Sequence, residues 1–357
     1  MKLERAHIKA VDPATEDGEP GPYDAGPAEE DLWFLPGPDP EQDEDPFAPP
    51  LPKARRTSLF DPVEWRAAEA ALTHELSDLA VDLGRLAERA AVMGPSAAER
   101  LAQAEAASLS WWTGDRIPPD RIALWISLRI GATGDDSAAL IRTAWASRRL
   151  AAPQATGQGR AARIAAHLGL DAAPPSDLIE DLASLLPQPG ELGAVATGCA
   201  IFHLWRALEE RPAHLRDIEA AVLGARLGLG IEDQALGFLP LSLAGMRALT
   251  VSGPPERKLA GWIAGAHNAV LSALMTLERL RRWRSQAEAG TGDLSGRTPR
   301  LLIEGLLRRP MVAVPQLVAE TGASRQAVLR NLAIFEDRGL VREVTGHGRF
   351  RVWTAKL

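Results

Sequence analysis

Three side chains near the carboxyl end are of the types that contact DNA base edges: Arg325, Gln326 and Arg330. Arginine can donate two hydrogen bonds to guanine, and glutamine can donate to and accept from adenine. All three, with Asn331, fall on one side of the segment SRQAVLRNLAIFEDRG if it is helical. We expect the first three to be base-contacting residues in the major groove.

A second group consists of donors that could bind phosphate oxygens, which position a protein on a duplex without reading its sequence. Ser324 opens the same segment, and the others follow it in the segment LVREVTGHGRFRVW. The predicted phosphate-contacting residues are Ser324, Arg342, His347, Arg349 and Arg351.

The elements that must position these side chains can be predicted from the local sequence. TPRLLIEGLLRRP and VPQLVAETG each predict a helix, and Gly322 can adopt the positive φ that a tight turn requires. Ser324 is a helix cap, and Ala327, Val328, Leu332 and Phe335 form an apolar stripe. A hairpin turning at GHG follows. This order predicts a winged helix-turn-helix over residues 299–357.

Charge is distributed unevenly along the 357 residues. Residues 1–52 contain 14 acidic and 3 basic residues, whereas residues 297–357 contain 11 basic and 5 acidic residues. The N-terminal stretch is also rich in proline and glycine, a composition that disfavours a packed core. We predict an acidic, mostly disordered arm at 1–57, an all-α domain at 58–289 and a linker at 290–298.

The middle of the chain repeats apolar residues at three- and four-residue intervals, which is typical of amphipathic helices. Ser96 and Glu99 have the spacing of a capping box. The longest predicted helix, Pro254 to Ala289, leads into the linker. We therefore expect a mostly α fold, a helical bundle with a C-terminal winged helix. This long helix is our candidate for a homodimer interface in the helical domain.

Several classes of function are not indicated by the sequence. The single cysteine, Cys199, cannot form an internal disulfide and is expected to be buried. The seven histidines show no metal-ligand spacing with a carboxylate. No apolar run is long enough to cross a bilayer. We expect a cytoplasmic protein with no metal, no cofactor, no catalytic residues and no membrane association.

The stretch GASRQAVLRNLAIFEDRGLVREVTGHGRFRVW resembles the winged-helix tail of many Fic-family proteins. With EAASLSWWTGDRIPPDRIALWISLRIG and AIFHLWRALEE, the chain also resembles an alphaproteobacterial family of unknown function that joins a helical domain to such a tail. The resemblance implies a C-terminal DNA-binding domain.

Fic chemistry depends on a signature in which a histidine base precedes a glycine-rich nucleotide loop. APQATGQGRAAR, from Ala152 to Arg163, matches part of that signature, but Ala152 stands at the base position and Thr156 at the acid position. Without a base, nucleotidyl transfer has no evident catalyst. The stretch is therefore interpreted as a surface loop.

Two hypotheses from different classes follow. The first is a DNA-binding transcriptional regulator that contacts double-stranded DNA and is not an enzyme. The alternative is a divergent Fic-like nucleotidyltransferase or nucleotide-binding protein with the winged helix as a targeting module. A third possibility is an adaptor that binds a basic partner through the acidic arm.

Overall fold

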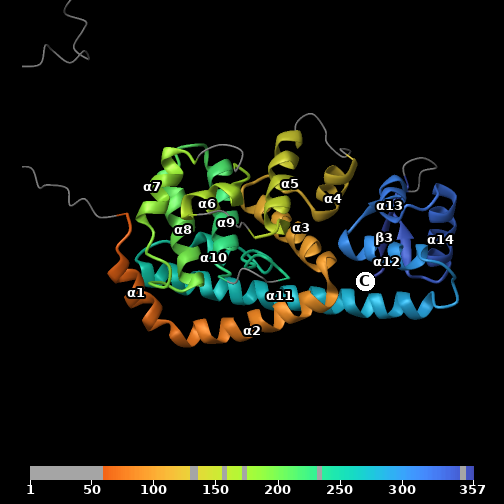
Figure 1. Ribbon diagram of the computed structural model, residues 1–357, viewed down its shortest axis with the longest axis horizontal. Coiled ribbons are helices and arrows are strands. Elements are labelled where there is room, and N and C mark those ends of the chain that lie inside the picture. The colour runs from red at the N-terminus through yellow and green to blue at the C-terminus, as the bar shows by residue number, and fades with distance from the viewer. Residues whose placement is uncertain (1–58, 129–135, 155–158, 171–174, 231–234, 346–350) are drawn as a thin grey trace, which may run out of the picture. The chain divides into compact units, whose positions relative to one another are not determined.

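The computed structural model describes residues 59–128, 136–154, 159–170, 175–230, 235–345 and 351–357 (Figure 1). The predicted arm at 1–57 lies outside the described residues. Ser58–Leu357 forms one compact unit by its internal contacts. Its fold confirms the predicted class, a helical body with a C-terminal winged helix-turn-helix and a small sheet.

The body consists of helices joined by connecting segments, the longest of which is residues 228–246, and no strand occurs among its described residues. Its helices are α1 (Pro62–Ala71), α2 (Thr73–Met93), α3 (Pro95–Trp112), α4 (Pro119–Leu128), α5 (Ser137–Ala151), α6 (Arg160–Leu168), α7 (Asp177–Leu185), α8 (Ala194–Leu208), α9 (Ala213–Leu227), α10 (Arg247–Thr250) and α11 (Pro255–Gly290).

Helix α11 is the longest element, with 36 residues, and it packs along α2 (Figure 1). The helix begins one residue after the predicted start and ends one residue after the predicted end. Two polar contacts join the helices: His267 Nε2 lies 2.7 Å from an Asp82 carboxylate oxygen, and Arg89 Nη1 lies 3.3 Å from Glu278. The predicted long helix is therefore present, and α2 covers one of its sides.

Helices α8 and α9 approach each other closely because glycines line their contact. A Cβ added at Gly198 would lie 2.6 Å from the carbonyl oxygen of Gly224, which is closer than a van der Waals contact allows. The Trp262 ring of α11 packs at the same place, 2.7 Å from the position of a Cβ on Gly224. Any larger residue at Gly198 would therefore separate the two helices.

The C-terminal region contains α12 (Thr298–Arg308), β1 (Val312–Ala313), α13 (Val314–Thr321), α14 (Arg325–Asp337), β2 (Val341–Glu343) and β3 (Val352–Ala355). The strands form an antiparallel sheet in the order β1-β3-β2. The two arms of the predicted hairpin are β2 and β3, and its predicted turn at residues 346–348 lies outside the described residues. Strand β1 was not predicted, because two residues are too few to show an alternating pattern.

The predicted capping box at Ser96 and Glu99 is wrong. Helix α3 begins after Gly94, and no side chain caps it. Ser96 instead donates to Glu304 of α12 at 3.3 Å, and Glu99 pairs with Arg308 at 3.3 Å. Both side chains therefore connect the body to the winged helix.

The end of α11 is also in contact with the C-terminal region. Trp283, 2% exposed, donates from Nε1 to the carbonyl oxygen of Leu340 at 2.8 Å. Arg338 donates to the carbonyl oxygen of Gly290 and pairs with Asp293. Residues 291–297 connect α11 to α12. The domain boundaries that we inferred from the sequence stay predictions.

Cys199 is buried, as expected. No helix in the described part of the chain combines the length and apolar composition that crossing a bilayer requires.

Candidate nucleic-acid interface

The turn before α14 has the geometry that its sequence predicts. Gly322 ends α13 in the left-handed conformation, with φ of 65°, where a side chain would add strain. Ser324 then caps α14, because its hydroxyl oxygen accepts from the Ala327 amide at 3.2 Å. Thr321 accepts from the Ala323 amide at 3.2 Å. These local contacts fix the direction in which α14 leaves the turn.

One side of α14 is buried against the rest of the winged helix. Val328, Leu332 and Phe335 are fully buried, and Ala327 is half-buried. The prediction that Asn331 lies on the same side of this helix as Arg325, Gln326 and Arg330 is wrong. Asn331 is only 7% exposed, and its side-chain amide donates to the carbonyl oxygen of Ala327 at 2.8 Å. Asn331 therefore belongs to the fold of the helix.

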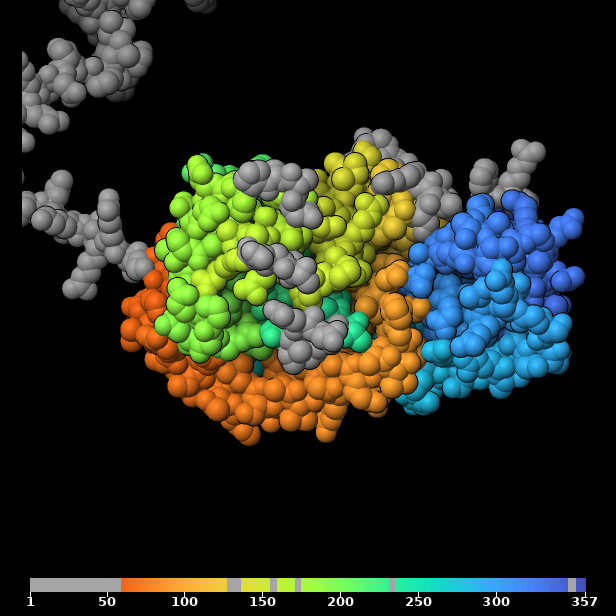
Figure 2. Space-filling view, in the orientation of Figure 1, coloured from red at the N-terminus to blue at the C-terminus, as the bar shows by residue number. Residues whose placement is uncertain are grey.

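The opposite side of α14 carries the three predicted base-contacting residues, and all three are exposed: Arg325, Gln326 and Arg330. No ion pair holds either arginine among the described residues. Helix α14 packs on α12, α13 and β2, whereas α3 contacts α12 and α4 contacts β1. The body thus contacts other elements of the winged helix, and this side of α14 stays open to solvent. In Figure 2 the C-terminal elements, in blue, form a continuous exposed surface.

Positive charge is concentrated at the N-terminal end of α14. Arg325 lies in the first turn, where the helix dipole adds a partial positive charge. The acidic residues of this helix, Glu336 and Asp337, lie in its last turn. The first turn of α14 therefore attracts an anion more strongly than the last turn does.

The predicted phosphate-contacting residues have different environments in the structure. Ser324 and Arg342 are exposed, and Arg342 has no ion pair within the described chain. Arg351 is exposed but pairs with Glu343, with Nε 3.3 Å from a carboxylate oxygen, and its guanidinium lies 5.3 Å from the Trp353 ring centroid. The sequence analysis did not predict the ion pair with Glu343. His347 and Arg349 lie outside the described residues.

Arg297 is a further cation at this site that the sequence analysis assigned to the linker. It is exposed, and its guanidinium nitrogen would lie 3.6 Å from a Cβ on Gly322. It therefore borders the turn between α13 and α14. The sequence separation between Arg297 and Ser324 does not predict that Arg297 borders this turn, because it is the fold of α12 and α13 that brings the two segments together.

The stretch that partly matches the Fic signature has structural contacts in its described residues. The Gln154 amide donates to the carbonyl oxygen of Gly237 at 3.1 Å. Arg160 donates to the carbonyl oxygens of Ala183, Leu186 and Pro187 at 2.5–3.0 Å. Residues 155–158, which include Thr156, lie outside the described residues. No group of three or more potential metal-ligating side chains occurs within the described ranges.

The comparisons with known proteins identify the C-terminal region alone. No curated protein matches the chain. The matches support neither the Fic-family resemblance nor the alphaproteobacterial family. Residues 299–355 match the family described as the HTH DNA binding domain, so the chain carries a helix-turn-helix DNA-binding domain on the elements α12 to β3.

Proposed function

We propose that the protein is a transcriptional regulator that binds double-stranded DNA through α14 and is not an enzyme. One observation carries the proposal: the exposed arginines of α14 have no ion pair with any described residue and lie on the open side of a helix-turn-helix domain. Arg325, Gln326 and Arg330 contact base edges in the major groove. Ser324, Arg297 and Arg342 contact phosphates beside it.

The phosphate contacts are tested by the salt dependence of binding. Replacing Arg297 and Arg342 together with alanine is expected to weaken binding to every duplex sequence to a similar extent. Each phosphate contact that is lost lowers the slope of log K against log salt by about 0.9. The slope is measured by fluorescence anisotropy over a series of salt concentrations, on a selected site and on an unrelated duplex.

The matched control is Arg257→Ala, which removes an exposed arginine at the start of α11, away from the winged helix. It should leave the slope unchanged. If the Arg297/Arg342 variant keeps the slope of the parent, these two residues do not contact phosphates.

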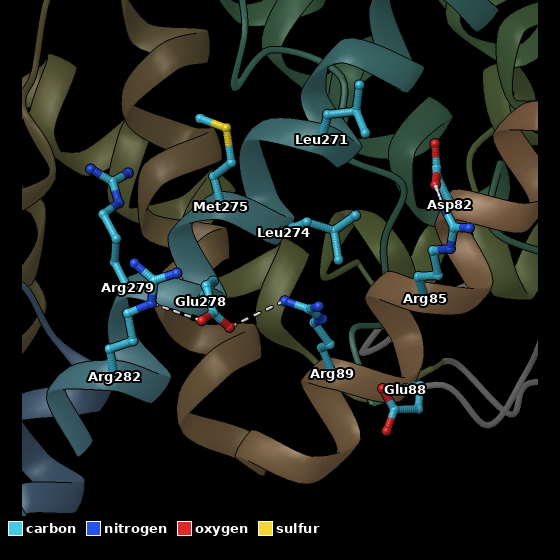
Figure 3. Close-up of a pocket in the computed structure, with 10 residues that line it drawn as sticks. All are labelled: Asp82, Arg85, Glu88, Arg89, Leu271, Leu274, Met275, Glu278, Arg279 and Arg282. Atoms are coloured by element: carbon cyan, nitrogen blue, oxygen red, sulfur yellow. Dashed lines mark hydrogen bonds and ion pairs between the residues drawn. The ribbon is translucent and has the colours of Figure 1, made fainter. Parts of the chain in front are cut away.

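We further propose that the protein is a homodimer through the α2–α11 face. A groove of about 780 Å³ lies between these helices, and Figure 3 shows Leu271 and Met275 of α11 along it. Met275 is 64% exposed and Leu271 is 41% exposed. Exposed apolar side chains rimmed by charges are typical of protein interfaces.

The charges around this groove favour a second copy of the chain as the occupant. Arg89 and Arg282 pair with Glu278 within the chain, whereas Glu88 and Arg279 have no ion pair among the described residues (Figure 3). In a dimer with twofold symmetry the same patch faces itself, so Glu88 of each protomer can pair with Arg279 of the other. Two such pairs would flank the apolar residues.

Charge reversal tests this arrangement. Glu88→Arg alone and Arg279→Glu alone are each expected to weaken dimerisation at least tenfold, because each puts like charges opposite one another. The variant carrying both changes restores the pairs with reversed polarity and should recover the dimer. Sedimentation equilibrium measures all four proteins. A parent that sediments as a monomer, or a double variant no better than the singles, contradicts the interface.

A further inference from the structure

The outward side of α14 carries one apolar side chain among its polar ones. All residues of this helix, Arg325–Asp337, are described, and Ala333 is its one exposed apolar residue. Leu329 and Ile334 are half-buried, and Leu329 packs against the hydrophobic core. The packing of the winged helix therefore does not account for an apolar residue at position 333.

The position of Ala333 on the helix follows from the helical period. Successive residues of an α-helix are turned by about 100°, so Gln326, Arg330 and Ala333 fall within an arc of about 60°. The arc is opposite Val328 and Phe335, which are fully buried. Ala333 therefore lies near the centre of the exposed side of α14, in line with two of the residues proposed to contact base edges.

The residues one turn before and one turn after Ala333 have opposite charges. Arg330 precedes it and has no ion pair with a described residue, and Asp337 follows it and is exposed. A carboxylate repels phosphate oxygens, so the sugar-phosphate backbone is disfavoured at the Asp337 end of the arc. Base edges, and not phosphates, are the groups that Ala333 can face in a complex with DNA.

The chemistry of the side chain selects among the base edges. Thymine presents an apolar group in the major groove, its C5-methyl group, and an alanine side chain can contact that group directly. The other bases present hydrogen-bond donors or acceptors at the corresponding edge. An alanine pressed against such a group excludes water without replacing its hydrogen bond, which is unfavourable. A thymine is therefore the base that fits Ala333.

We propose that Ala333 is a specificity-determining residue of the DNA site, in van der Waals contact with the C5-methyl group of a thymine. The inference rests on the proposed function, because it requires α14 to lie in the major groove. Ala333 follows Arg330 by a rise of about 4.5 Å along the helix, and successive base pairs are about 3.4 Å apart. The thymine therefore lies about one or two base pairs from the base that Arg330 contacts.

Replacement of thymine by deoxyuridine tests the contact, because the two bases differ by the methyl group alone. The probes are duplexes that carry the site selected from genomic DNA by the full chain, with each thymine changed to deoxyuridine in turn. Binding is measured by fluorescence anisotropy. At one thymine position of the motif the change should weaken binding about threefold to fivefold, the effect of losing one buried methyl group.

Two variants assign this effect to Ala333. Ala333→Gly should bind the thymine and deoxyuridine duplexes with equal affinity. Glycine also weakens the helix, but it does so for both duplexes, so the ratio of the two dissociation constants reports the methyl contact. Ala67→Gly is the matched control, because Ala67 is an exposed alanine of α1, and this variant should keep the ratio of the parent.

The outcomes separate this contact from the proposed function. A parent that binds all duplexes alike overturns both, because no base is then read. Selective binding to a motif without thymine, or equal affinity for thymine and deoxyuridine at every position, overturns the Ala333 contact and leaves the DNA-binding function standing. A ratio in Ala333→Gly that equals the ratio of the parent has the same meaning.

Discussion

Replacing Arg325 and Arg330 together with alanine is expected to abolish sequence-selective DNA binding. Each arginine is exposed on α14 and has no ion pair among the described residues, so each is available to a base edge. A good base contact contributes about 1–3 kcal/mol of discrimination, so the double change should cost about 2–6 kcal/mol on the selected site. Competition between the selected and scrambled duplexes, measured by electrophoretic mobility shift, gives this difference.

The control for this experiment replaces two arginines that belong to the same domain but lie outside α14. Arg308 and Arg309, at the end of α12, pair with Glu99 and Glu320 and do not lie on α14. Their double alanine variant should retain selectivity for the site. An equal loss of selectivity in both double variants would show that the net charge of the domain, and not the exposed side of α14, determines binding.

Replacing Trp283 with alanine is expected to lower the free energy of unfolding by about 3–5 kcal/mol. The side chain is 2% exposed and joins the end of α11 to the winged helix through the Leu340 carbonyl oxygen. Trp283→Phe retains most of the packing but leaves that carbonyl oxygen without its donor, which costs about 1–3 kcal/mol. Guanidinium denaturation followed by circular dichroism measures both variants.

Trp111, 58% exposed at the end of α3, provides the matched control for this series. Its replacement by alanine should cost less than about 1 kcal/mol, because little buried surface is lost. If Trp283→Ala costs no more than Trp111→Ala, the contact between α11 and Leu340 does not hold the winged helix to the body.

The features that sequence predicted well are those set by neighbours within a few residues. The Ser324 cap, the positive φ of Gly322 and the buried stripe at Val328, Leu332 and Phe335 depend on local geometry. The apolar period likewise predicted α11 to within one residue at each end. Such signals are strong because capping and periodicity act within one or two turns.

The errors and omissions arise where tertiary contacts determine the role of a residue. Ser96 and Glu99 fit a capping box in sequence, yet both contact α12, some 200 residues away. Asn331 has a side chain suited to adenine but uses it on its own helix. Arg351 pairs with Glu343 across the hairpin. The cavity of about 300 Å³ lined by Ile164 and Ile201 could not be predicted, because its lining comes from α6, α8, α9 and the segment between α7 and α8.

The central claim is that the exposed face of α14 selects particular DNA sequences. Selection of fragmented genomic duplex DNA by the full chain, followed by sequencing of the bound fragments, tests this directly. The account predicts an enriched motif, made of two related half-sites about 10 base pairs apart if the dimer forms, that disappears with the Arg325/Arg330 double alanine variant. Recovery of fragments with no common motif, or of the same motif by that variant, would contradict it.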